Sequence, residues 1–91
     1  MRDPDAQGYY EVAGNVHLHT RYSDGSGLHE DVAQAARRAG LDFFIATDHN
    51  VLARGEEGWR NGVLCLVGEE INDPLPPRAN HYLAIGIAED V

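Results

Sequence analysis

Two histidines one residue apart are the first residues in this chain that could do chemistry. His17 and His19 lie in a segment of alternating polar and apolar residues, and residues i and i+2 of a β-strand point to the same face. Two imidazoles about 7 Å apart along a strand can bind one metal ion or two neighbouring ions. Asp24 follows in a Ser-Asp-Gly turn, where the chain can fold back and bring a carboxylate to the same place.

Ionisable pairs stand at the carboxyl ends of the next two apolar segments. Asp48 and His49 follow one segment, and Glu69 and Glu70 follow the other. Functional side chains of α/β proteins gather at the carboxyl ends of strands, so we expect these pairs to meet the first histidines. His81 opens a later apolar segment and comes close to Glu70 if that segment returns beside the preceding strand. The residues alone do not decide which of the two glutamates would be the ligand.

This combination of side chains is typical of a metal centre. Imidazole and carboxylate ligands together suit Zn²⁺, Mn²⁺ or Fe²⁺ better than Ca²⁺ or Mg²⁺. Bridging carboxylates favour clusters of two or three ions, which lower the pKa of a shared water and hold the attacked group. A lone His-x-His pair is a weak signal, whereas the ordered series of motifs is far more specific.

One amphipathic segment, residues 28–39, predicts a helix. Ser26 or Gly27 can cap its start, and Gly40 supplies a left-handed stop. The apolar positions that we expect to face the core are Leu28, Val32, Ala35, Ala36 and Ala39.

Four segments predict strands. Residues 9–18 are β-prone, 43–47 and 63–67 are almost wholly apolar, and 82–87 form a fourth apolar stretch. The first three strands with the intervening helix predict β-α-β packing with a parallel component. Three prolines within residues 71–80 leave no place for a crossover helix, so the last two strands are predicted to be adjacent and antiparallel.

Size and composition favour one small globular domain without signal peptide or membrane span. The chain has 91 residues, of which 43% are hydrophobic, and residues 1–8 form a polar lead-in. The net charge of −8 argues against a nucleic-acid partner, because phosphates would be repelled. Cys65 is the one cysteine, which excludes a disulfide framework and favours a packing role. We expect a cytoplasmic protein with a small-molecule substrate and no membrane partner.

In order and spacing, these motifs resemble those of the PHP (polymerase and histidinol phosphatase) superfamily. The motifs lie in residues 17–25, 47–50, 68–71 and 80–83, and the match covers residues 9–88. The runs Gly-Glu-Glu-Ile-Asn and Asn-His-Tyr-Leu-Ala-Ile-Gly are most similar to its CehA/McbA-like metallohydrolase branch.

The resemblance implies a distorted (β/α)7 barrel with two or three divalent ions, Zn, Mn or Fe. It also implies hydrolysis of phosphoester or related ester bonds, carbamate and aryl esters included, by a metal-bound hydroxide. Glu70 is favoured over Glu69 because the family pattern is Gly-x-Glu, and Glu70 and His49 are the residues expected to act with that hydroxide. The family ligands map onto His17, His19, Asp24, His49, Glu70 and His81.

Other polar residues are given lesser roles. Asp48 is expected to anchor the end of its strand and the neighbouring ligands rather than bind metal. Arg21 and Tyr22 lie in the metal loop and are weak candidates for substrate contact. His29 is expected at the solvated surface of the helix, and Trp59 is expected to pack inside.

The family barrel needs roughly twice this length. We therefore expect residues 9–91 to form the N-terminal part of a truncated PHP-type domain, a partial barrel of about four strands and one helix. Such a part leaves a strand edge and an apolar helix face bare, which predicts instability with self-association or pairing with a complementing C-terminal segment. The alternative function is a non-catalytic metal-binding or interaction module with an incomplete site.

Overall fold

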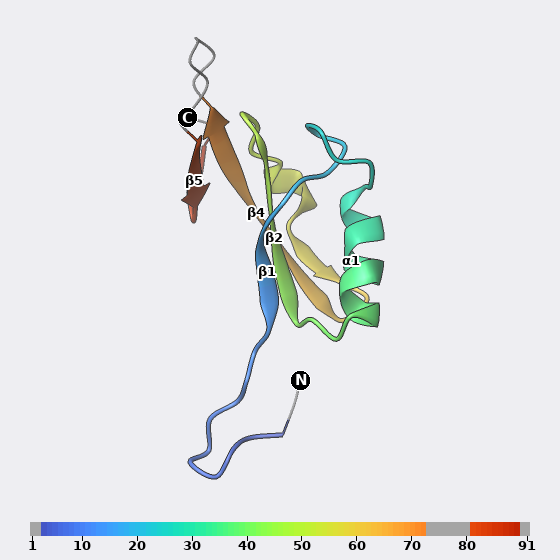
Figure 1. The fold of residues 1–91 in the computed structure, drawn as a ribbon, viewed down its shortest axis with the longest axis vertical. Coiled ribbons are helices and arrows are strands. Elements are labelled where there is room, and N and C mark those ends of the chain that lie inside the picture. The colour runs from blue at the N-terminus through green and yellow to red at the C-terminus, as the bar shows by residue number, and fades with distance from the viewer. Residues whose placement is uncertain (1–2, 73–80, 90–91) are drawn as a thin grey trace.

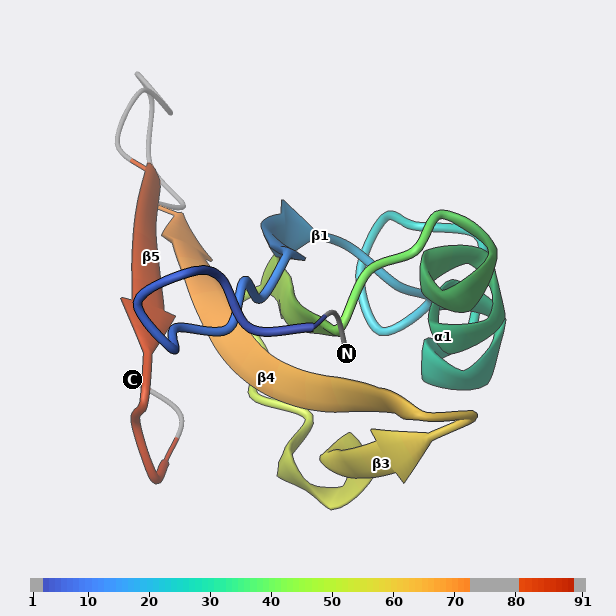
Figure 2. The same ribbon diagram turned by 90° about the horizontal axis from the view of Figure 1, so that it is seen from below.

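The computed structural model describes residues 3–72 and 81–89, and in these residues one helix packs on one face of a mixed sheet (Figure 1). Figure 2 shows the helix on one side of the sheet and the last strand far from it. None of the described helices is long and apolar enough to cross a membrane. The elements are β1 Gly14–Leu18, α1 His29–Arg38, β2 Phe43–His49, the 3-10 turn η1 Arg54–Glu56, β3 Gly58–Arg60, β4 Val63–Asn72 and β5 His81–Ile85.

The ten-residue strand β4 organises the sheet. One edge of β4 pairs with β2 in parallel, and β2 pairs in parallel with β1. The other edge of β4 pairs with β3 near its start and with β5 near its end, both antiparallel. The predicted parallel packing of the first strands and the antiparallel pairing of the last two are confirmed.

The predicted partial (β/α)7 barrel is wrong. The described chain forms a mixed five-stranded sheet with a single α-helix. The connection from β2 to β4 contains η1 and β3 instead of a second helix. Because the antiparallel strands β3 and β5 occupy the free edge of β4, the sheet does not continue there with the parallel strand that a barrel requires.

The hydrophobic core lies between α1 and the sheet. Phe44 and Cys65 are fully buried and pack with Ala33 of the helix, which confirms the packing role of Cys65. Burying one side chain such as Phe44 contributes about 1.5–3 kcal/mol. Since side chains alternate along a strand, the neighbouring positions of β2 and β4 face the opposite side of the sheet, where His49 and Glu70 lie.

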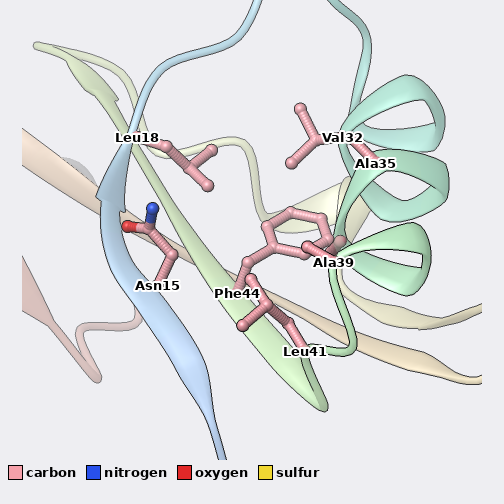
Figure 3. Close-up of a pocket in the computed structure, with 8 residues that line it drawn as sticks. Asn15, Leu18, Val32, Ala35, Ala39, Leu41 and Phe44 are labelled. Carbon is pink, nitrogen blue, oxygen red and sulfur yellow. The ribbon is translucent and has the colours of Figure 1, made fainter.

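The buried face of α1 agrees only in part with the predicted one. Ala36 is buried and Val32 packs against the core as expected. His29 and Ala33 are also buried, whereas Leu28 is 48% exposed. The helix packs against β2, β4 and β3, and part of its apolar surface borders an open groove of about 220 Å³ beside β1 (Figure 3). The groove is lined by Asn15, Leu18, Val32, Ala35, Ala36, Ala39, Leu41 and Phe44.

Two local predictions were wrong and one was confirmed. The N-cap residue is Leu28 rather than Ser26 or Gly27, and the Leu28 N–H donates to the Asp31 carboxylate at 2.9 Å. Gly40 has a φ of +79° and ends the helix as predicted. Trp59 is 71% exposed rather than packed inside, because it lies on the short strand β3 at the edge of the sheet.

Candidate metal centre

The buried carboxylate of Glu70 is the centre of a histidine cluster. Glu70 is 3% exposed and lies on the face of β4 opposite the helix. Its Oε1 atom is 2.7 Å from His17 Nε2 and 2.8 Å from His19 Nε2. Its Oε2 atom is 2.6 Å from His81 Nδ1. Three imidazoles from two distant segments therefore surround one carboxylate.

The sheet brings these side chains together. β1, β2 and β4 are parallel, so their carboxyl ends lie at the same end of the sheet. His49 lies opposite Glu70 in the register of β2 and β4. β5 returns antiparallel and places His81 opposite Asn72. A side chain at Gly68 would come within 2.7 Å of the backbone oxygen of Ala84, so the glycine permits the close approach of β5. The predicted proximity of His81 to Glu70 is confirmed.

Asp24 joins a second group that shares His19. Asp24 Oδ1 is 2.6 Å from His19 Nδ1, and Asp24 Oδ2 is 3.1 Å from His49 Nε2. His49 Nδ1 is in turn 3.9 Å from Glu70 Oε2, so the two groups are continuous. A side chain at Gly25 would collide with the His19 backbone, which explains the glycine that follows Asp24.

The histidines control the ionisation of Glu70. Burial opposes ionisation, but hydrogen bonds from His81, His17 and His19 outweigh it and lower the pKa of Glu70 to about 2. A hydrogen bond to Asn72 raises the pKa of His49 above its ordinary value, burial opposes that change, and the charge of Glu70 adds to it. Glu70 is therefore a carboxylate at neutral pH.

The donor set fits divalent transition metals. His17, His19 and Glu70 each offer one ligand atom within 4.8 Å of the others, and so do His19, Asp24 and His49. Imidazole nitrogens and carboxylate oxygens are the ligands that Zn²⁺, Mn²⁺ and Fe²⁺ prefer. His19 faces the first group with Nε2 and the second with Nδ1, and a neutral imidazole binds an ion through one of these nitrogens. The residues present thus offer two overlapping groups of ligands for divalent ions.

All six predicted ligands thus lie in one cluster, and their binding of metal stays a prediction. The choice of Glu70 agrees with the geometry, because Glu70 contacts the imidazoles. Glu69 is also buried but lies on the other face of β4. Asp48 stays outside the cluster and accepts hydrogen bonds from Thr20 and Ser23, as expected of an anchoring residue.

Arg21 and Tyr22 are not brought into the cluster. The Arg21 side chain is exposed. The Tyr22 ring lies 5.4 Å from the His29 ring, and its hydroxyl donates to Glu56 at 3.4 Å. These contacts are structural, and a role in substrate binding stays a prediction.

The predicted surface position of His29 is wrong. His29 is 1% exposed, and in the described part of the chain its Nε2 atom has no hydrogen-bond partner. The reason is the rotation of the helix: the first turn of α1 directs His29 toward Tyr22 and the sheet instead of solvent.

Asn72 also contributes to the cluster, although it was not predicted to do so. Its Oδ1 atom is 2.6 Å from His49 Nδ1, and its Nδ2 atom is 3.1 Å from His81 Nδ1. One available signal was the spacing, because Asn72 follows Glu70 by two residues and so shares its face of the strand.

Comparison with known proteins adds no relative to this picture. No family model, curated protein or solved structure matches the chain.

Proposed function

We propose that this chain carries the site of a PHP-type metal-dependent hydrolase that cleaves phosphoester or related ester bonds of a small molecule. The observation that supports the proposal is the convergence of four imidazoles and two carboxylates, from distant parts of the sequence, around the buried Glu70. The PHP-type assignment depends on the motifs and not on a barrel.

Each oxygen of Glu70 has its own partners, which suits a bridging carboxylate. Oε1 faces His17 and His19, whereas Oε2 faces His81. His19, Asp24 and His49 would hold a neighbouring ion. When bound, Zn²⁺, Mn²⁺ or Fe²⁺ lowers the pKa of a water and polarises the attacked phosphoryl or carbonyl group.

The chain's own residues position these donors and leave them accessible. The Asn72 amide oxygen accepts from His49 Nδ1 at 2.6 Å, which leaves His49 Nε2 free to face Asp24 and an ion. The side chains of His17 and Asp24 are 51% and 63% exposed. A small substrate can therefore approach the cluster from solvent.

That same exposure favours the second candidate, a non-catalytic metal-binding module. Enzymes of this kind close the reacting centre away from water, whereas His17, Asp24 and His81 are about half exposed or more on the described structure. Two or three ions per chain with turnover would support the hydrolase. One ion without turnover would support the module.

The test is hydrolysis of a chromogenic phosphodiester and a chromogenic carboxylate ester by the Mn²⁺- or Zn²⁺-loaded chain. The H17A/H19A double variant should lose at least about a hundredfold in rate on any ester that the wild type cleaves, since one variant removes ligands of both candidate ions. Equal rates for the wild type and the double variant would contradict the hydrolase proposal.

A further inference from the structure

Three residues outside the ligand set connect the turn between His19 and Asp24 to the end of β2. Asp48 is 1% exposed, and its Oδ1 atom accepts hydrogen bonds from the Thr20 N–H at 2.6 Å and the Ser23 hydroxyl at 2.7 Å. Its Oδ2 atom accepts from the Thr20 hydroxyl at 2.7 Å. We call Asp48, Thr20 and Ser23 the Asp48 clasp.

The clasp holds both ends of that turn. Thr20 directly follows His19, and Ser23 directly precedes Asp24. Within the turn, the Ser23 and Gly25 N–H groups donate to the Thr20 carbonyl at 3.1 and 2.9 Å. The distance between the two ligands is therefore set by a backbone fixed to Asp48 at two points.

Asp24 depends on this support more than the other ligands do. Its side chain is 63% exposed, so core packing does not hold it. His17 and Glu70 lie within β1 and β4 and are held by the sheet. Asp48 also directly precedes His49 in the sequence. Fixing Asp48 thus holds Asp24 in place relative to His19 and His49.

The chemistry of the clasp suits a rigid support. A buried carboxylate is costly unless hydrogen bonds satisfy it, and here three donors at 2.6–2.7 Å do so. Hydrogen bonds to an ionised acceptor are shorter and about twice as strong as neutral ones. Thr20 is itself fully buried, which keeps water from competing.

We propose that the Asp48 clasp is a positioning device that holds Asp24 against His19 and His49, and that the His17 and Glu70 side of the centre does not depend on it. This inference rests on the proposed function only in assuming that the cluster binds metal.

The test compares S23A and T20V, each of which removes one hydroxyl of the clasp, with T47V as the matched control. Thr47 is a fully buried threonine on the same strand whose hydroxyl contacts the Leu18 carbonyl at 3.4 Å, outside the clasp. In a stepwise Mn²⁺ titration with a competing chelator, the clasp variants should weaken one binding step by about 10-fold or more. The other step, and both steps of T47V, should stay within about twofold of the wild type.

A second measurement on the metal-free chain separates failure of this inference from failure of the proposed function. Imidazole ¹⁵N shifts of S23A and T20V should change for His19, whose Nδ1 faces Asp24, and stay as in the wild type for His17. A wild type that binds no ion overturns the proposed function, while the shifts still test the clasp. Unchanged His19 shifts, equal weakening of both binding steps, or a T47V that behaves like the clasp variants would overturn the clasp.

Discussion

The side-chain amide of Asn72 orients His49. Asn72 Oδ1 accepts from His49 Nδ1 at 2.6 Å, so Nδ1 carries a proton and Nε2 is the nitrogen that faces Asp24. N72A should therefore weaken metal binding by about 10–100-fold, and N72D, which keeps an acceptor oxygen, should restore most of it. Chelator competition with Zn²⁺ measures both values. Wild-type affinity in N72A would contradict this role.

Buried His29 gives folding a pH dependence of its own. Burial lowers the pKa of His29, the charges of Glu56 and Asp48 partly oppose the shift, and Arg60 adds to it. The unfolded chain binds this proton at about pH 6.5. Between that pH and the lower pKa of the folded state, the unfolded state holds more protons, so the free energy of unfolding falls as pH falls.

Replacing His29 by leucine should remove that contribution. The stability of H29L should exceed or approach that of the wild type at pH 5 and lose this advantage above about pH 7. Urea unfolding across this range, read as the difference between the two chains, cancels the titration of the cluster histidines. A difference independent of pH would contradict the assignment.

At the residue scale, the alternation of side chains along a strand and the spacing of the motifs predicted the site residues better than composition did. His17 and His19 converge because they alternate on one face, and Asp24 was predicted from its glycine-flanked turn. The position of His29 could not be predicted, because it depends on which side of α1 the sheet covers. Asn72 was not predicted, because a neutral amide is not by itself a candidate ligand, and only its spacing from Glu70 pointed to the cluster.

At the element scale, the close pairing of β4 and β5 depends on Gly68. A Cβ atom there would come within 2.7 Å of a backbone oxygen and 3.3 Å of Thr47 and Ile85. G68A should therefore cost about 1–3 kcal/mol of stability and shift the His81 ring resonances. Gly55 has nothing within 4 Å of such an atom, so G55A is the matched control and should change stability by less than about 0.5 kcal/mol. Equal effects of the two substitutions would contradict the packing argument.

The sequence allowed the order of the strongly apolar strands to be predicted. It did not show whether the sheet closes into a barrel. The apolar runs at 43–47 and 63–67 lie in the parallel strands β2 and β4. β3 was not predicted, because a strand of three residues, Gly58–Arg60, is too short to show the alternation of polar and apolar residues. The barrel prediction came from the family likeness alone, and the antiparallel strands on β4 contradict it.

At the scale of the whole molecule, exposed apolar surface predicts self-association. Val16 on β1 is 50% exposed, Leu83 and Ile85 on β5 are 42% and 49% exposed, and the groove beside β1 is open. Exposed apolar edge strands promote pairing between chains. Sedimentation of the metal-free chain should show oligomers, and V16K should shift the distribution toward monomer. A metal-free monomer with cooperative thermal unfolding would contradict this expectation.

The most direct test of the metal centre compares two neighbouring carboxylates. Glu69 and Glu70 are both buried, but Glu70 alone of the pair contacts His17, His19 and His81. Bound Zn²⁺ or Mn²⁺ is counted per chain in the wild type, E69Q and E70Q, with circular dichroism to confirm folding. We expect two or three ions for the wild type and E69Q, and at least about a tenfold loss of affinity in E70Q. Equal metal content in E70Q and the wild type, or no ion in the wild type, would contradict it.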